Sequence, residues 1–217
     1  MSKRVLVTGG SGYFGESILK KLIDKGYDCS VLDINLPDKL ILEKVKFFKT
    51  DIRDYDGVLH ACKNIDYIFH NVAQVPLAKN KELFNSVNNT GTKNITKAAA
   101  LSGCKHFVYT SSSAVYGVPP DNPVNEDTPT IPAEEYGLAK LNGEKMCNSF
   151  KDKMNVTIIR PRTILGSGRL GIFQILFEWV YQNQNLPVFD GGNNIYQFVH
   201  CDDLADACIK SVENKST

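Results

Sequence analysis

The chain has 217 residues, of which 42% are hydrophobic and 23% are charged, and its formal net charge is +1 at pH 7. This length is enough for one domain with a buried core and a small appendage. A nearly neutral chain without a long basic run lacks the electrostatic footprint of a protein that binds nucleic acid or an anionic membrane. No stretch reaches the roughly 20 apolar residues of a membrane span or resembles a signal peptide, so we predict a cytoplasmic protein.

Strand and helix patterns alternate from the first residues onward. Apolar runs predict strands at Arg4–Thr8, Asp28–Asp33, Val45–Thr50, Tyr67–His70, His106–Ser111 and Val156–Arg160. Helices are predicted between them at Gly12–Lys25, Asp54–Ala61, Lys81–Leu101 and Ala133–Phe150. The strands show little alternation of apolar and polar residues, which is typical of a sheet covered on both faces. We therefore predict an α/β fold of Rossmann type, with a doubly wound parallel sheet.

The pattern loosens after the sixth predicted strand. A helix is predicted over Ile172–Tyr181, and Asp202 is a candidate N-cap for a last helix over Leu204–Val212. We interpret residues 1–165 as a dinucleotide-binding domain. Residues 166–217 would be the beginning of a smaller substrate-binding region, with the last helix packing back on the first domain.

The cysteines and histidines predict neither a disulfide nor a metal site. None of the six cysteines forms a Cys-x-x-Cys pair, which favours buried, reduced thiols. The four histidines are isolated and lack the spacing of metal ligands. We therefore predict that the protein holds no metal.

A Gly-rich turn, TGGSGYFG, joins the first strand to the first helix. Gly9, Gly12 and Gly15 would allow a tight turn and let a pyrophosphate approach the helix N-terminus closely. Tyr13 and Phe14 lie in the same turn and are predicted to contact the cofactor. The alternative is an ordinary strand-to-helix turn.

Asp33 ends the second predicted strand, where a carboxylate can accept hydrogen bonds from the adenosine ribose. Its charge would repel a 2′-phosphate, and the following Ile34 and Asn35 offer no arginine to hold one. NAD is therefore favoured over NADP, with Asn35 beside the cofactor. The alternative is that Asp33 simply caps a loop.

Later strand ends add further predicted cofactor contacts. Asp51 can meet the adenine amino group and Ile52 the ring face, although aspartate is also an ordinary turn residue. Val72 and Ala73 would pass close to the pyrophosphate and the nicotinamide ribose. His70 precedes them and is assigned no chemical role.

Ser112, Tyr136 and Lys140 are the candidate catalytic residues. Tyr136 and Lys140 share one helical face. Tyrosine has a pKa of about 10, but a neighbouring ammonium and a positive nicotinamide favour the phenolate, so Tyr136 can act as a base. Lys140 can also bind the nicotinamide ribose, and the Ser112 hydroxyl can stabilise negative charge on the substrate oxygen. The alternatives are a chance Tyr-x-x-x-Lys spacing and serines that satisfy backbone groups.

The chain resembles the extended short-chain dehydrogenases/reductases of the NAD-dependent epimerase/dehydratase group. The likeness spans nearly the whole chain and rests on TGGSGYFG, LDIN, TDIRD, FHNVAQVP, VNNTGT, VYTSSSAVYG, YGLAK, IIRPRTILGSG and YQFVHCDDLADA. It implies NAD as cofactor and a catalytic Ser112, Tyr136 and Lys140. It also implies that Asn88 holds the cofactor surroundings in place and that Pro161 and Thr163 lie near the cofactor.

Several residues depart from the family pattern. Thr163 stands where sugar-nucleotide epimerases commonly carry an asparagine, and Tyr196 stands where an arginine is often found. Ser113 and Ala114 replace the Asp-Glu pair of sugar-nucleotide 4,6-dehydratases, which argues against dehydration. The run Arg160-Pro161 resembles the corresponding segment of the 3β-hydroxysteroid dehydrogenase-like branch. Because family members continue well beyond the last residue, the resemblance implies a fragment or a minimal version.

Three functions are compatible with these motifs. The first is oxidation of a secondary alcohol by hydride transfer to NAD, on a nucleotide-activated sugar and within an epimerisation. The second is a 3β-hydroxysteroid-dehydrogenase-like dehydrogenase or reductase. The third is a non-catalytic dinucleotide sensor, against which the retained Ser112, Tyr136 and Lys140 argue.

The resemblance also implies a homodimer that pairs Lys81–Leu101 and Ala133–Phe150 in a four-helix interface; the alternative is that these faces are solvated.

Overall fold

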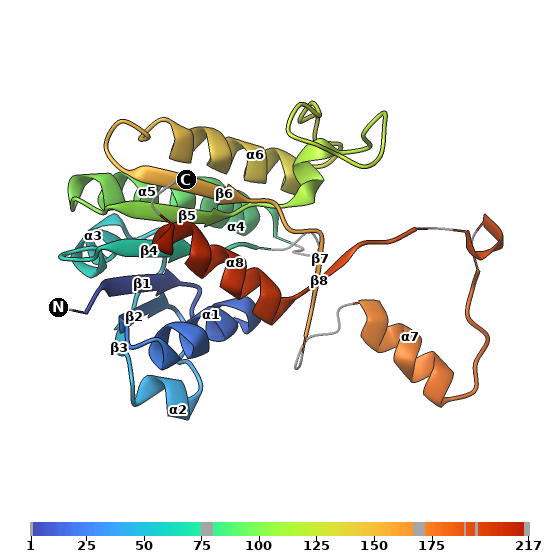
Figure 1. Cartoon of the computed structure of the whole chain (residues 1–217), viewed down its shortest axis with the longest axis horizontal. Coiled ribbons are helices and arrows are strands. Elements are labelled where there is room, and N and C mark those ends of the chain that lie inside the picture. Colours follow the sequence, from blue (N-terminus) through green and yellow to red (C-terminus); the bar gives the residue numbers. More distant parts are fainter. Residues whose placement is uncertain (1, 75–79, 167–171, 189, 194, 215–217) are drawn as a thin grey trace.

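A six-stranded parallel sheet forms the centre of the computed structural model (Figure 1). The model describes residues 2–74, 80–166, 172–188, 190–193 and 195–214. The strands are β1 (Arg4–Thr8), β2 (Asp28–Asp33), β3 (Lys46–Lys49), β4 (Tyr67–His70), β5 (His106–Thr110) and β6 (Asn155–Ile159). Their order, β3-β2-β1-β4-β5-β6, is that of the doubly wound Rossmann fold, so the predicted fold class is confirmed.

Helices cover both faces of this sheet. One face carries α1 (Tyr13–Asp24), α2 (Lys39–Leu42) and α8 (Cys201–Glu213), and the other carries α3 (Tyr55–Ala61), α4 (Lys81–Asn85), α5 (Thr92–Leu101) and α6 (Glu135–Asn148) (Figure 1). Successive side chains of a strand point to opposite faces. Val5 and Val7 therefore pack in the core beneath α1 and α8, and Leu6 packs in the core beneath α3 and α5. Because both cores need apolar residues, the strands are apolar on both sides.

The predicted helix over Lys81–Leu101 is not regular. A π-helical segment, Ser86–Gly91, separates α4 from α5. The hydroxyl of Thr92 donates to the carbonyl of Asn88 at 2.7 Å, and such back-bonding perturbs a regular helix. π-Helical turns are frequent at functional sites, and this one places Asn88 behind the end of β4.

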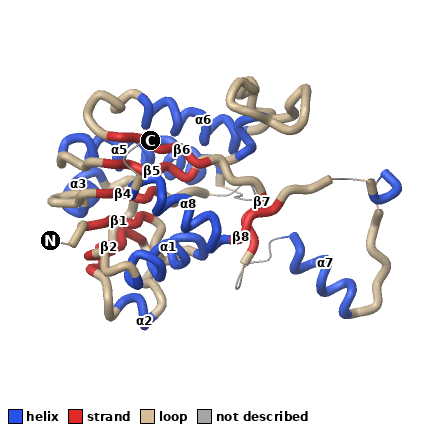
Figure 2. Tube along the Cα trace, viewed as in Figure 1, coloured by secondary structure: helices blue, strands red, loops and turns tan. Residues whose placement is uncertain are grey.

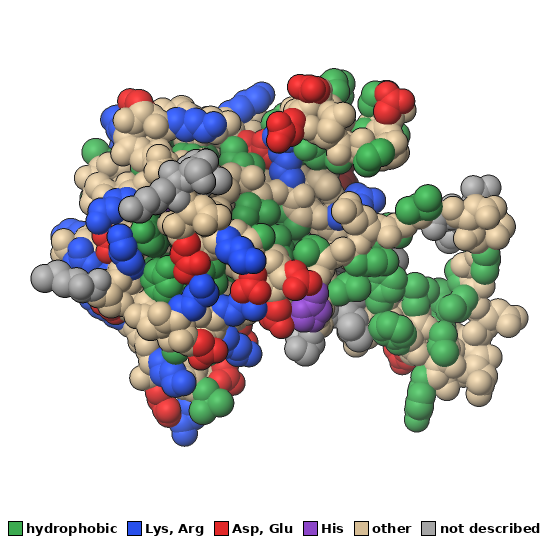
Figure 3. All heavy atoms as spheres, in the orientation of Figure 1, with side chains coloured by type: hydrophobic (Ala, Val, Ile, Leu, Met, Phe, Trp, Pro, Cys, Tyr) green, Lys and Arg blue, Asp and Glu red, His purple; other side chains and the backbone are tan. Residues whose placement is uncertain are grey.

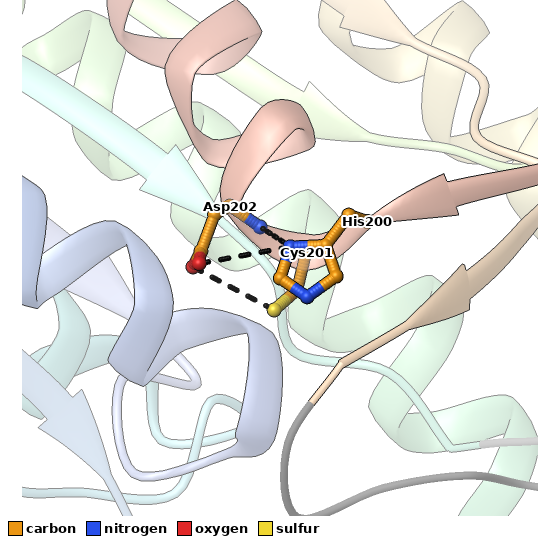
Figure 4. A group of neighbouring side chains, drawn as sticks. All are labelled: His200, Cys201 and Asp202. Atoms are coloured by element: carbon orange, nitrogen blue, oxygen red, sulfur yellow. Dashed lines mark hydrogen bonds and ion pairs between the residues drawn. The ribbon is translucent and has the colours of Figure 1, made fainter.

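The start of α8 differs from the prediction, because Asp202 is not its N-cap. The helix begins at Cys201, and Nδ1 of His200 accepts the backbone N–H of Asp202 at 3.3 Å (Figure 4). The carboxylate of Asp202 instead accepts the hydroxyl of Ser17 at 2.8 Å. Asp202 therefore ties α8 to α1, which brings the last helix back onto the sheet.

A second, small sheet and a projecting arm follow β6. The sheet pairs β7 (Thr163–Leu165) with β8 (Phe198–His200) in parallel, and neither strand was predicted. Between them, α7 (Ile172–Tyr181) extends away from the body of the molecule (Figures 1 and 2). Large apolar side chains gather on this arm (Figure 3), and Phe177 is 56% exposed. None of the helices in the described residues is both long and apolar enough to cross a membrane.

Candidate active site

A cleft of about 720 Å³ lies at the carboxyl ends of the six parallel strands. Doubly wound folds bind ligands at this edge, and the volume lies within the roughly 300–1,000 Å³ of small-molecule sites. Every candidate site residue lines the cleft except two: Gly9, Gly12, Tyr13, Phe14, Gly15, Asp33, Asn35, Asp51, Ile52, Val72, Ala73, Ser112, Tyr136, Lys140 and Pro161 do so. Asn88 and Thr163 are not among its lining residues.

The Gly-rich turn leaves the N-terminus of α1 open toward the cleft. Gly9 has a φ of 70°, which favours glycine, and its carbonyl accepts the N–H of Gly12 at 3.1 Å. A Cβ atom at Gly15 would collide with the carbonyl oxygen of Gly9. Gly12 is the N-cap of α1 and has no capping side chain. The first N–H groups of the helix are therefore available to an anion.

The Asp33 carboxylate is fixed at the end of β2 by two backbone N–H groups. Ser11 donates to Oδ2 at 3.1 Å, and Asn35 donates to Oδ1 at 3.0 Å. The Ser11 hydroxyl also donates to the carbonyl of Asn35 at 2.6 Å. Asp33 thus organises a loop and lines the cleft at once. Each carboxylate oxygen keeps acceptor capacity for a further donor.

The Asp51 carboxylate is already paired with a basic residue that the sequence analysis did not single out. Arg53 donates from Nη2 to Oδ2 at 2.6 Å and from its backbone N and Nε to Oδ1, both at 2.9 Å. These bonds hold the pKa of Asp51 below its ordinary value. A ligand that contacts Asp51 would share it with Arg53, which also lines the cleft.

Asn88 lies behind the cleft wall and holds the loop that follows β4. Its Oδ1 accepts the backbone N–H of Gln74 at 2.8 Å, and its Nδ2 donates to the Gln74 carbonyl at 3.1 Å. Val72 and Ala73 immediately precede this pair of bonds. Asn88 therefore acts on the cleft by positioning the loop.

Lys140 is buried and lines the cleft. Its Nζ donates to the carbonyl of Thr110 at 2.7 Å and lies 5.9 Å from the ring centre of Tyr136. Burial lowers the pKa of Lys140 to about 8, against the opposing influence of the Cys147 thiol and the Glu144 carboxylate. The ammonium is therefore present at neutral pH.

Ser111 and Ser112 both line the cleft at the end of β5 and bond different partners. Ser112 lines the cleft, and its Oγ accepts the backbone N–H of Ala114 at 3.1 Å. That bond uses an acceptor site of the hydroxyl and leaves its O–H to donate elsewhere. Ser111 is buried and donates to Oε1 of Glu144 at 2.5 Å.

A partly buried ion pair anchors α6, the helix that carries Tyr136 and Lys140. Arg160 donates to both carboxylate oxygens of Glu144, at 2.9 and 2.7 Å, and to the hydroxyl of Tyr116 at 2.8 Å. This pairing raises the pKa of Arg160. Glu144 was not predicted, although its position four residues after Lys140 places it on the same side of the helix.

Among the described residues, the hydrogen-bond partners of His70 are two threonine hydroxyls, which give it a structural role. Thr8 Oγ1 lies 2.6 Å from Nδ1, and Thr92 Oγ1 lies 3.3 Å from Nε2. Burial, together with the charge of Lys140, lowers the pKa of His70 to about 3. The ring is therefore neutral and joins β4 to β1 and α5.

His200, Cys201 and Asp202 bring potential metal-ligand atoms within 4.8 Å of one another (Figure 4). The hydrogen bonds at the start of α8 account for this arrangement. Nδ1 of His200 caps the helix, while the Cys201 thiol lies 3.7 Å from the Asp202 carboxylate that also binds Ser17. We assign this cluster no metal.

Comparison with known proteins shows similarity to a family described as NAD dependent. The model of the NAD dependent epimerase/dehydratase family matches residues 5–217. An uncharacterized protein of Sinorhizobium fredii, y4nG, is 53% identical over 95% of this chain. The match covers 52% of that protein, so the chain spans about half of its length.

Two characterised groups of proteins are similar at lower identity. UDP-glucose 4-epimerase of Mycolicibacterium smegmatis is 31% identical over 96% of this chain and 72% of its own. Human sterol-4-alpha-carboxylate 3-dehydrogenase, decarboxylating, is 30% identical over 99% of this chain and 59% of its own. The Bordetella bronchiseptica enzyme WbmG, solved in complex with NAD, superposes with a TM-score of 0.87 at 20% identity, over 100% of this chain and 70% of that one.

Proposed function

Since the chain belongs to the NAD-dependent epimerase/dehydratase family, we propose that it oxidises a secondary alcohol of a small-molecule substrate by hydride transfer to NAD. This membership confirms the resemblance drawn from the sequence and NAD as the cofactor of the family. The observation that carries the proposal is that Ser112, Tyr136 and Lys140 line one cleft together with the Gly-rich turn.

The residues of the cleft fit a dinucleotide. The open N-terminus of α1 at Gly12 would hold the pyrophosphate, and the fixed carboxylate of Asp33 would accept the hydroxyls of the adenosine ribose. Val72 and Ala73 would lie along the pyrophosphate and the nicotinamide ribose. When bound, NAD supplies the nicotinamide ring that accepts the hydride.

Each residue of the trio has a distinct role in this proposal. Tyr136 removes the proton of the substrate hydroxyl. The ammonium of Lys140, fixed by the Thr110 carbonyl, favours the phenolate of Tyr136 and would bind the nicotinamide ribose. Ser112 donates its hydroxyl to the substrate oxygen, where negative charge develops.

We favour a nucleotide-activated sugar as substrate and an epimerisation as the overall reaction. The similarity to a UDP-glucose 4-epimerase over nearly the whole chain supports this choice. In such a reaction the oxidised sugar turns in the site and takes the hydride back on its other face. A net dehydrogenase is the second candidate. It is supported by the similarity to the human sterol dehydrogenase, and by Thr163 and Tyr196, which replace the asparagine and the arginine of the epimerase pattern.

Three further expectations stay predictions. Residues 166–217 would contribute to the substrate region, and the protein would act in the cytoplasm. It would also pair α4–α5 and α6 with a second copy in a four-helix interface. Leu101 and Leu138, which are 62% and 50% exposed on these helices, support the last expectation.

The direct test is Tyr136→Phe, with UDP-glucose as the probe substrate and conversion to its 4-epimer as the readout. Loss of the base is expected to lower turnover by roughly two to four orders of magnitude while NAD still binds. Tyr55→Phe, on α3 and outside the cleft lining, is the matched control and should retain wild-type turnover. Wild-type turnover in Tyr136→Phe would contradict the proposal.

A further inference from the structure

Three basic side chains are among the described residues that line the cleft, and two of them are engaged within the protein. Lys140 donates to the Thr110 carbonyl, and Arg53 is paired with the Asp51 carboxylate. The third is Arg162, which follows Pro161 and is exposed. No carboxylate in the described part of the chain lies within ion-pair distance of its guanidinium.

Arg162 is nevertheless held in place by an aromatic partner. Its Cζ lies 5.2 Å from the ring centre of Tyr196. The Tyr196 hydroxyl accepts a hydrogen bond from Oγ1 of Thr163 at 3.0 Å, and its ring lies 5.0 Å from that of Phe198. The parallel pairing of β7 with β8, which sets Thr163 opposite Phe198, brings these side chains together.

This arrangement presents a charged donor group to the cleft. A guanidinium that rests on an aromatic face keeps its N–H groups available to an oxyanion and loses little entropy on binding it. Two parallel N–H···O bonds from arginine are specific for carboxylate or phosphate oxygens. Arg162 lines the cleft together with Ser112 and Tyr136, whereas Asp33 and Asp51 line the part assigned to the adenosine.

We propose that Arg162, supported by Tyr196, binds an anionic group of the substrate beside Ser112 and Tyr136. The inference rests on the proposed function, since it places the substrate in that cleft. The group is a phosphate or a carboxylate, and both candidate substrate classes can carry one. A diphosphate-linked sugar and a carboxylated sterol would use the same guanidinium.

The test is binding to the NAD-saturated protein, measured by titration calorimetry. The probes are UDP-glucose against uridine and a sterol 4-carboxylate against the decarboxylated sterol. Arg162→Gln is expected to weaken binding of the preferred anion by about ten- to a hundred-fold, since it removes a charge-assisted hydrogen bond. Binding of the neutral counterpart should not change. Which anion responds distinguishes phosphate from carboxylate.

Three more variants separate the charge from the packing. Arg162→Lys keeps the charge without the planar fork and should recover part of the lost affinity. Tyr196→Leu should weaken anion binding by a smaller factor, because Arg162 loses its support. Lys39→Gln removes an exposed charge on α2, outside the cleft lining, and should match the wild type.

The proposal is overturned if Arg162→Gln binds the anions as tightly as the wild type. It is also overturned if the wild type binds neither anion better than its neutral counterpart, or if Arg162→Gln loses affinity for NAD, which would make Arg162 a cofactor contact. These outcomes are separable from the fate of the proposed function. Turnover that survives Tyr136→Phe would remove the catalytic assignment and leave the binding result intact.

Discussion

The body of the molecule and the arm that follows β6 are built in different ways. In the body, Gly9, Asp33 and Ser112 reach one cleft because the strands they follow end at the same edge of a parallel sheet. The arm has a three-residue strand on either side of α7, and large apolar side chains gather on its surface (Figure 3). Phe177 is one of its exposed residues. The comparison indicates that the sheet positions the proposed catalytic residues, whereas the proposed substrate contacts come from elements with little core of their own.

The largest expected effect is on NAD affinity and comes from the Gly-rich turn, which belongs wholly to the body of the molecule. Gly15→Ala places a Cβ atom against the carbonyl oxygen of Gly9. This overlap costs about 3 kcal/mol, and the turn must shift to relieve it. Because NAD binding requires the original turn, the affinity for NAD is expected to fall by about a hundred-fold, which calorimetry can measure. Gly103→Ala, where the φ of 72° strains an alanine although its Cβ atom meets open space, is the control for destabilisation outside the turn and the cleft lining. Equal NAD affinity in the two variants would argue against a cofactor at this turn.

The next effect concerns the anchor of α6. Glu144→Gln leaves Arg160 without its ion-pair partner and is expected to lower the free energy of unfolding by about 3 kcal/mol. That value is the lower end for buried pairs, because the Arg160 side chain is 30% exposed. Denaturant unfolding measures it, with the exposed Glu43→Gln expected to stay within about 0.5 kcal/mol of the wild type. A loss no larger than that of Glu43→Gln would mean that the pair does not anchor the catalytic helix.

The pH dependence of stability should carry the signature of Lys140. Its pKa in the ligand-free folded protein is about 8, against an ordinary value of 10.5. Between these values the unfolded chain binds a proton that the folded chain does not, so Lys140 makes the free energy of unfolding rise with pH, by at most about 1.4 kcal/mol per unit.

The control for this slope is Lys140→Met, and the quantity compared is the difference between the two proteins. Burial raises the pKa of Cys29, Cys62, Cys104, Cys147 and Cys208 to about 12. Above about pH 9 these thiols lower stability as pH rises, and the four other than Cys147, which alone interacts with Lys140, do so equally in both proteins. If the difference in free energy of unfolding between the two proteins does not change between pH 8 and 10, the pKa of Lys140 is not lowered in the folded protein.

The smallest effect is expected at the loop after β4. Asn88→Ala removes two hydrogen bonds to the backbone of Gln74 and frees the loop that carries Val72 and Ala73. We expect NAD affinity to fall by about five- to ten-fold, since each bond contributes about 1 kcal/mol or less. The exposed Asn148→Ala on α6 is the control, and a similar change in both variants would remove the positioning role.

The body could be predicted from the sequence because its signals are local. Apolar runs located the strands, and the Gly-rich turn with Asp33 and the Tyr-x-x-x-Lys spacing located residues that the sheet then brings together. Glu144 was missed because its anchoring role depends on hydrogen bonds with Arg160 and Ser111. These residues are distant in the sequence, and only the packed fold places them beside Glu144.

The arm could not be predicted in the same way. A three-residue strand such as β7 has too short a pattern to recognise, and its partner β8 lies far along the chain. Tyr196 was interpreted as the loss of a basic contact, yet the strand pairing stacks Arg162 on its ring. His200 caps α8 in place of Asp202, because a ring nitrogen can accept the N–H that an aspartate usually takes.

The most direct measurement is the identity and amount of the dinucleotide that the protein binds, determined by denaturing purified protein and separating the released nucleotide by chromatography. The account predicts NAD, near-stoichiometric if the cofactor stays bound through an epimerisation. A site that is empty on purification and binds NAD reversibly would favour the dehydrogenase. NADP in the site, or failure to bind NAD at all, would contradict the roles given to Asp33 and the Gly-rich turn.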